Sequence, residues 1–210
     1  MGKIIYILLL IILENDFYKD IKKANVINYD FIVNKNYKLS ENYIPDDMEK
    51  ISLEFSCKDK YLRKIAKIYF EKMANDGKKK GFNIIAVSTY RSYKYQEKLY
   101  NNYVNDKGLH YADMASARPG HSEHQTGLAV DIADLSLDYD NFENTKEFNW
   151  VKHNAHKYGF ILRYPKAKFH ITGFKYEPWH YRYVGIKSAT YIYKNNITLE
   201  EYKKITHKCN

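Results

Sequence analysis

The chain has 210 residues, which is enough for one well-buried domain and too few for two. Its formal net charge of +9 favours anionic surroundings, but the basic residues are spread along the chain without a nucleic-acid-binding motif, so we expect no nucleic-acid partner. Only Cys57 and Cys209 are present, outside any Cys-x-x-Cys pair, which excludes a cysteine-rich metal site.

The N-terminus combines a lysine with an apolar run of signal-peptide length. Lys3 precedes ten apolar residues, 4–13, and this run is too short to span a bilayer conventionally. Residues 1–28 are therefore expected to be an export or anchor segment with a linker, and residues 29–210 one folded domain. Residues 11–13 are bulky and no small-x-small cleavage site follows, which favours an uncleaved membrane anchor, but the sequence leaves a cleaved signal and a secreted protein open. A buried core segment is the structural alternative.

The predicted export segment places the protein outside the cytoplasm, where we expect it to act as a monomer. In that compartment Cys57 and Cys209 would either form one disulfide or remain two separate thiols, and the sequence leaves both open. A disulfide would tie the C-terminal tail back to the domain.

Hydrophobic periodicity divides the domain into helices and strands. The predicted elements in chain order are a strand over 31–33, a helix over 59–75, a buried strand over 82–87, a helix over 93–103, a loop over 108–117, a helix over 148–158, a strand over 160–164, a helix over 189–193 and a last helix that opens with a capping box at Thr198 and Glu201. This pattern indicates an α+β domain whose helices cover one face of a mainly antiparallel sheet.

Residues 118–134 concentrate imidazoles, carboxylates and glycines beside a short apolar run. His124 and Asp131 lie seven residues apart across Gly127, so we expect the chain to turn at the glycine and enter a strand from which Asp131 projects toward the histidine. An imidazole and a carboxylate together suit zinc, although such sites accept other divalent ions, and a catalytic zinc needs a third protein ligand. The segment is therefore interpreted as half of a metal site.

The other half is expected at residues 175–184, where His180 follows Glu177 by three residues. Pro178 disfavours helix for the residue before it, so the pair differs from a helical His-Glu-x-x-His motif and must converge through a turn or an irregular strand. His180 is the candidate third ligand. Glu177 is the candidate general base, since a carboxylate beside a zinc-activated water can take its proton as the water attacks a carbonyl.

Taken together with residues 90–92, Tyr-Arg-Ser, these motifs resemble the VanY-type zinc D-alanyl-D-alanine carboxypeptidases, whose relatives include L,D-carboxypeptidases that trim peptidoglycan stem peptides. The resemblance implies the fold that these peptidases share with the hedgehog signalling domain. It implies a Zn²⁺ ion held by His124, Asp131 and His180, with Glu177 as catalytic base. By the same transfer, the substrate contacts would be made by Arg91, Gln96, Ser122 and Tyr164.

Two of these substrate residues have a second interpretation. Arg91 stands at the end of the predicted strand over 82–87, where a guanidinium would bind the substrate's terminal carboxylate or support developing negative charge, but on position alone an exposed or salt-bridged arginine is an equal reading. Tyr164 would line the cleft or pack in the core, since the chain has 22 tyrosines. His121 and Glu123, which flank Ser122, receive no role.

The expected activity is release of the C-terminal D-alanine from peptidoglycan stem pentapeptides. An L,D-carboxypeptidase acting on tetrapeptide stems and an endolysin-like endopeptidase would use the same zinc site, and the pocket for the penultimate residue decides between them. A catalytically silent wall-binding module is the alternative from another class. Three ligands beside a carboxylate argue against that module, because binding alone requires no base at an open metal position.

Overall fold

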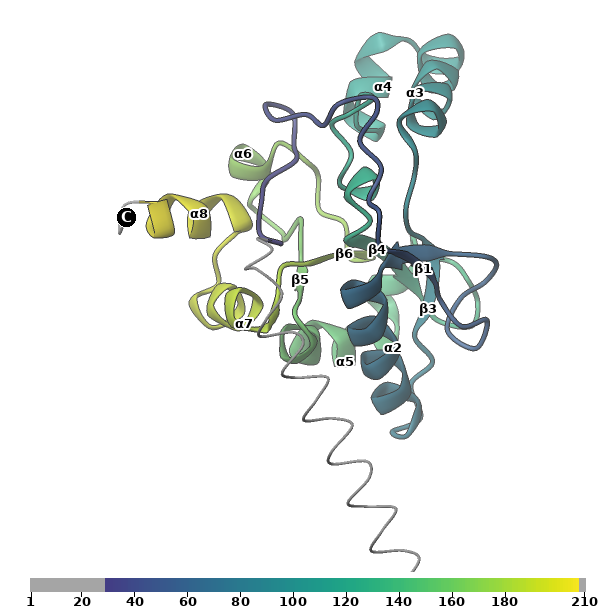
Figure 1. Cartoon of the computed structure of the whole chain (residues 1–210), viewed down its shortest axis with the longest axis vertical. Helices are drawn as coiled ribbons and strands as arrows, with labels where there is room; N and C mark the ends of the chain where they lie inside the picture. Colours follow the sequence, from purple (N-terminus) through teal and green to yellow (C-terminus); the bar gives the residue numbers. More distant parts are fainter. Residues whose placement is uncertain (1–28, 208–210) are drawn as a thin grey trace, which may run out of the picture.

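Four antiparallel strands form the central sheet (Figure 1). The computed structural model, which describes residues 29–207, orders them β3 (Ile85–Ser88), β4 (Ala129–Ala133), β6 (His180–Tyr183) and β5 (Phe160–Leu162). Every residue of the two inner strands, β4 and β6, is buried. Another two strands, β1 (Met48–Lys50) and β2 (Tyr61–Arg63), pair as a separate antiparallel ribbon. The predicted α+β class with an antiparallel sheet is confirmed.

Helices lie on both sides of the strands. Figure 1 shows α3 (Tyr93–Lys107) and α4 (Leu109–Ala115) side by side at one end of the molecule, with α2 (Lys64–Lys78) and α5 (Lys146–Asn154) at the other end. The remaining helical segments are η1 (Glu123–Thr126), η2 (Phe142–Asn144), η3 (Ala155–Tyr158), α6 (Phe169–Thr172), α7 (Ile186–Asn195) and α8 (Leu199–His207). Buried residues of α2 and α5 belong to the same apolar core as the strands, so these two helices support the sheet.

The main core forms where α2 meets this sheet. Phe70 and Met73 of α2 are fully buried, as the spacing of apolar residues predicts. The ring of Phe70 packs edge to face against Phe160 of β5, with 6.4 Å between centroids. Burying each such side chain contributes about 1.5–3 kcal/mol, so this contact fixes the helix against the sheet.

Two predicted elements near the N-terminal end of the domain were wrong in part. The helix expected from residue 59 begins only at Lys64, because residues 61–63 pair with β1 instead. Residues 31–33 form no strand. The backbone carbonyl oxygens of Tyr29 and Phe31 each accept a 3.0 Å hydrogen bond from the guanidinium of Arg182, and not from a neighbouring strand.

The predicted loop over 108–117 was also wrong, because most of it forms α4. Gly108, with φ of +82°, ends α3 and lets the chain reverse into α4. The hydroxyl of Tyr100 on α3 then donates a 2.6 Å hydrogen bond to Asp113 on α4. A helix of seven residues is not stable alone, so this packing decides its structure and sequence periodicity does not reveal it.

The C-terminal helix α8 opens as predicted. The backbone N–H of Thr198 donates to the Glu201 carboxylate at 2.7 Å, and the backbone N–H of Glu201 donates to the Thr198 hydroxyl at 3.2 Å. These two bonds are the reciprocal pair of a capping box, and that prediction is confirmed.

Two expectations fall outside the described residues. The export or anchor role of residues 4–13 is one, and the pairing of Cys57 with Cys209 is the other, because Cys209 lies beyond residue 207. Within residues 29–207, no helix has both the length and the apolar character needed to cross a membrane.

Candidate active site

A left-handed glycine sets the path of the chain between two predicted ligands. The short helix η1 ends at Gly127, whose φ of +67° is a conformation that side-chain-bearing residues rarely adopt. A Cβ atom there would also lie 2.7 Å from the sulfur of Met48. The chain turns at this glycine and enters β4, so the predicted turn and strand between His124 and Asp131 are confirmed.

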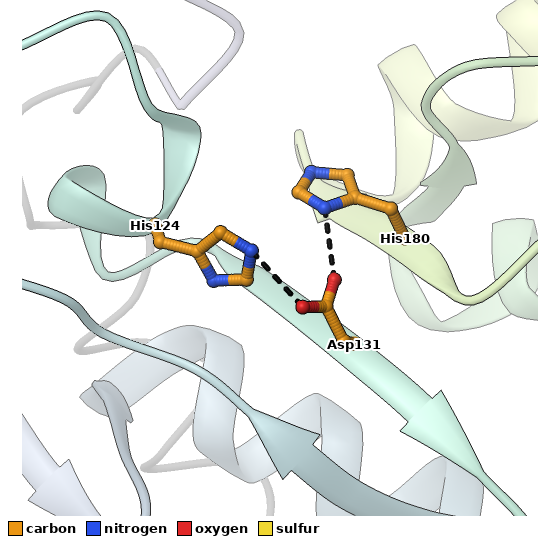
Figure 2. A group of neighbouring side chains, drawn as sticks. All are labelled: His124, Asp131 and His180. Carbon is orange, nitrogen blue, oxygen red and sulfur yellow. Dashed lines mark hydrogen bonds and ion pairs between the residues drawn. The ribbon is translucent and has the colours of Figure 1, made fainter. Parts of the chain in front are cut away.

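Strand register brings the third residue into the same place. Asp131 on β4 is directly opposite His180 on β6 in the antiparallel pair. Figure 2 shows both histidine rings directed at the Asp131 carboxylate: His124 Nε2 lies 3.2 Å from Oδ2, and His180 Nδ1 lies 2.9 Å from Oδ1. One ligand atom from each residue fits within 4.8 Å of the others, and all three side chains are buried. The three residues can hold a metal ion together.

Hydrogen bonds on the far side of each ring determine where the lone pairs point. His124 Nδ1 is 2.6 Å from the backbone oxygen of Thr89, which can only accept, so Nδ1 donates and the Nε2 lone pair faces Asp131. His180 Nε2 is 3.3 Å from a carboxylate oxygen of Glu123, so the same assignment directs the Nδ1 lone pair at Asp131. With both rings neutral, acceptor atoms of all three residues face one another in a buried site, an arrangement that suits a metal cation, and this donor set fits zinc.

The pKa values of the three residues show where charge is stable in the cluster. Burial lowers the pKa of His124 to about 4, helped by the nearby Arg91 guanidinium, so its ring is neutral at neutral pH. Burial opposes the charge on Asp131, but the two histidines hold its pKa well below the ordinary value. Burial would also lower the pKa of His180, yet its hydrogen bonds to Asp131 and Glu123 raise it to about 9. Asp131 is thus ionised and is stabilised by positive charge on the His180 side.

Glu177 approaches the cluster through the predicted turn. The backbone N–H of His180 donates to the Glu177 carbonyl oxygen at 3.2 Å, which closes a turn over Pro178 and Trp179. The Glu177 carboxylate lies 3.7 Å from His180 Nδ1, and its side chain is 25% exposed. Burial raises the pKa of Glu177 to about 7, against the pull of His180. A carboxyl group whose pKa is raised toward neutral pH therefore lies beside the candidate ligands.

All of the predicted site residues line one cavity of about 360 Å³. Arg91 follows β3, as expected, and the salt-bridged interpretation is confirmed, because its Nη2 donates to Asp131 at 3.2 Å. The side chain also lines the cavity and is 23% exposed, so its substrate-binding role stays a prediction. The members of the predicted set that line the cavity are Arg91, Gln96, Ser122, His124, Asp131, Tyr164, Glu177 and His180. The structure brings the set together; the roles of its members stay predictions.

Three of these residues differ in how they are held. Gln96 is 1% exposed, and its Nε2 donates to Ser116 and to the Ala117 carbonyl oxygen, while no described residue bonds its Oε1. Ser122 is buried and directly precedes η1. Tyr164 is buried and stacks on the ring of His180 with 4.9 Å between centroids, so it combines the packing and the cleft-lining readings.

Sequence reasoning missed Glu123, which belongs to a buried cluster that we call the ionic network: Glu123, Arg163, Arg182 and Glu200. The Oε1 atom of Glu123 accepts 2.8 Å hydrogen bonds from both arginines. Burial opposes its charge, but Arg163 and Arg182 hold the pKa of Glu123 well below the ordinary value. A glutamate between Ser122 and His124 was the available signal, and its partners lie too far along the chain to be recognised.

Comparison with known proteins gives the family. The model of the VanY family, described as D-alanyl-D-alanine carboxypeptidase, matches residues 59–186. A Bacillus subtilis (strain 168) protein named as a carboxypeptidase, YodJ, is 46% identical over 204 residues, which cover 90% of this chain and 75% of the relative.

Two solved structures extend the similarity. The LdcB LD-carboxypeptidase is 47% identical with a TM-score of 0.77, covering 82% of this chain and 84% of that chain. A mutant of the vancomycin resistance D,D-pentapeptidase VanY, in complex with Zn(II), is 33% identical with a TM-score of 0.71, covering 83% of this chain and 98% of that chain. Because the family model spans more than half of the sequence and these folds agree, the chain belongs to the VanY family of D-alanyl-D-alanine carboxypeptidases.

Proposed function

We propose that the chain is a zinc-dependent carboxypeptidase that releases the C-terminal D-alanine of peptidoglycan stem peptides outside the cytoplasm. The observation that carries the proposal is the convergence of acceptor atoms from His124, Asp131 and His180 beside the Glu177 carboxylate in one cavity. The Zn(II) complex of a VanY protein supports zinc as the ion. The family's action on peptidoglycan supports a location outside the cytoplasm, with residues 4–13 as export segment or anchor.

In the proposed reaction Glu177 transfers the proton, while activation of the water and the carbonyl group depends on the zinc ion. A bound zinc ion supplies a Lewis acid that lowers the pKa of a water and polarises the scissile carbonyl. Glu177 takes the proton of the attacking water and delivers it to the departing amine. Burial of the Glu177 side chain favours the protonated form and raises its pKa, which suits a group that must both accept and release a proton.

The remaining cavity residues bind and orient the peptide. Arg91 presents its guanidinium at the cavity, and its planar fork matches the C-terminal carboxylate of a stem peptide. The Oε1 atom of Gln96, which no described residue bonds, is available to a substrate N–H. Ser122 supplies a hydroxyl for the peptide backbone, and Tyr164 forms a wall against His180.

An L,D-carboxypeptidase is the second candidate. It releases the D-alanine of a tetrapeptide, where the preceding residue has an L-configured centre, and needs the same zinc, base and carboxylate anchor. The 47% identity with the LdcB LD-carboxypeptidase favours it, compared with 33% for the VanY D,D-pentapeptidase. The match to the D-alanyl-D-alanine carboxypeptidase model favours the D,D reaction.

The test is amino-acid release by the full chain from purified pentapeptide and tetrapeptide stems, with and without a chelator. Chelator-sensitive D-alanine release from the pentapeptide alone identifies the D,D reaction, and release from the tetrapeptide identifies the L,D reaction. Glu177→Gln, which keeps the size of the side chain and removes its charge, is the matched inactive control.

Other outcomes would replace the proposal. Cleavage within crosslinked peptides without release of a terminal residue would indicate an endopeptidase. Zinc binding without any hydrolysis would indicate a wall-binding module. Release that continues in the presence of chelator would remove the metal from the mechanism.

A further inference from the structure

The ionic network reaches the metal cluster through a single carboxylate. One oxygen of Glu123 binds both arginines, and the other, Oε2, lies 3.3 Å from Nε2 of His180. The side chains of Glu123, Arg163 and Arg182 are 0% exposed, so water cannot take part in these contacts. Glu123 therefore divides its two oxygens between the arginines and a candidate metal ligand.

The two arginines are themselves fixed from other parts of the chain. Arg163 makes a bidentate pair with Glu200 of α8, at 2.8 and 2.6 Å. Arg182 donates to the backbone oxygens of Tyr29 and Phe31. Each guanidinium is thus held at two ends, and the Glu123 carboxylate between them cannot swing away from His180.

Stability alone does not explain this arrangement. Apolar side chains of similar volume often replace a buried ion pair without loss of stability, because removing charges from water is unfavourable. The arginines bind Glu123 through Oε1, so their pairing makes no use of its second oxygen. That oxygen faces only the ring of His180 among the described hydrogen-bond partners of Glu123. The position of Glu123 therefore affects the ring of His180 and not only the stability of the network.

We propose that Glu123 is a positioning residue for His180, supported by Arg163 and Arg182. By accepting the Nε2–H, Glu123 fixes the tautomer in which the Nδ1 lone pair faces Asp131 and the ion. Tyr164 stacks on the same ring, so its orientation is set from an edge and from a face. The inference rests on the proposed function, because a metal ligand needs a fixed lone pair at Nδ1.

The first test is zinc affinity of the full chain, measured by competition with a chromophoric chelator. In Glu123→Gln, the amide oxygen can stay on the arginines while the NH₂ group faces the Nε2–H, so that two donors oppose each other. We expect zinc binding to weaken by about 10- to 100-fold, as is typical when such a partner of a ligand histidine is lost. Thermal unfolding and circular dichroism of the zinc-free variant check that it folds.

Glu200→Gln is the matched control. It removes the same charge from the same network and disturbs Arg163, but the described hydrogen bonds of Glu200 go to Arg163 and Asn34 and not to His180. We expect its zinc affinity to stay within about threefold of the wild type, against the 10- to 100-fold loss expected for Glu123→Gln. Should Glu123→Gln fail to fold, Glu123→Asp keeps the charge beside the arginines and withdraws the oxygen from the ring, with the same direction of effect.

A spectroscopic readout separates positioning from general support. In the ¹⁵N-labelled, zinc-loaded wild type, the Nε2–H of His180 should give a ring proton shifted downfield and protected from exchange, because it is buried against a carboxylate. The signal should move upfield or exchange rapidly in Glu123→Gln and stay unchanged in Glu200→Gln.

Each failure has a distinct signature. If the wild type binds zinc and Glu123→Gln binds it equally well, or if Glu200→Gln loses as much affinity, the positioning role of Glu123 is wrong while the proposed function stands. If the wild type binds no zinc, the proposed function fails and the inference fails with it.

Discussion

The two edges of the His180 ring meet opposite electrostatic environments. On the Nδ1 edge, Asp131 and His124 place further acceptor atoms beside a cavity, where the three residues can hold a cation. On the Nε2 edge, the ionic network balances two arginines against two glutamates, and Glu123, Arg163 and Arg182 are fully buried. We call the Nδ1 edge, which a bound ligand would complete, the reactive edge. We call the Nε2 edge, which other residues of the chain complete, the supporting edge. The His180 ring therefore lies between the candidate metal site and the ionic network.

The largest expected effect tests the reactive edge without touching a ligand. Glu177→Gln should lower kcat by about 10²- to 10⁴-fold, because the reaction loses its general base. Zinc content by atomic absorption should stay at the wild-type level. A variant that keeps its activity within threefold would contradict the role of Glu177.

The next effect tests the supporting edge. Arg163→Met leaves Glu200 buried without its bidentate partner, and the free energy of unfolding should fall by about 3–5 kcal/mol in urea denaturation. Lys78→Met is the control, because the ion pair of Lys78 with Glu54 is half exposed and should contribute about 0–1 kcal/mol. Equal losses in the two variants would show that the network is no stronger than a surface pair.

The third effect returns to the reactive edge. Zinc at 100 times its dissociation constant should stabilise the folded state by about 2.7 kcal/mol, since the ligand atoms converge only after folding. The measurement is urea unfolding with zinc and with chelator. Asp131→Asn should abolish the difference, because the acceptor that bridges both histidines is lost. A zinc shift that survives this substitution would place the ion elsewhere.

The smallest effect concerns the cap of α8, the helix that carries Glu200. Burial opposes the charge of Glu201, but bonds to Thr198 and Lys168 lower its pKa in the folded state. Its stabilising contribution is therefore complete above the ordinary pKa of glutamate and disappears as the pH falls through the lower folded value.

Glu201→Gln should accordingly reduce stability by about 1 kcal/mol at neutral pH and by less in acid. Urea unfolding near pH 7 and near pH 3 measures both. A difference that grows in acid would have the wrong sign and would exclude an ionised cap.

Local patterns predicted the reactive edge better than the supporting one. The turn at Gly127, the strand that carries Asp131 and the turn before His180 all follow from short-range chemistry, and strand register then brought the two ligands opposite each other. Their assignment as ligands came from the resemblance as well as from spacing.

The supporting edge depends on contacts that no local pattern contains. Glu123 meets residues 40 and 59 positions away, so its neighbours in sequence say nothing about its partners. The same limit explains the errors in the fold. Residues 31–33 have the composition of a strand, but the carbonyl of Phe31 binds Arg182, and α4 exists only because α3 lies beside it.

Arg182 and Arg163 bind partners that are far from them in the sequence. The Arg182 guanidinium binds the backbone oxygens of Phe31 and Tyr29, which are 151 and 153 residues earlier in the chain. Arg163 pairs with Glu200, which is 37 residues later. During translation, His124, Asp131, Glu177 and His180 all leave the ribosome before α8 does. Contacts of such long separation carry a loop-closure cost and slow folding. A nascent chain thus carries His124, Asp131, Glu177 and His180 before α8 has emerged to fix Arg163 through Glu200.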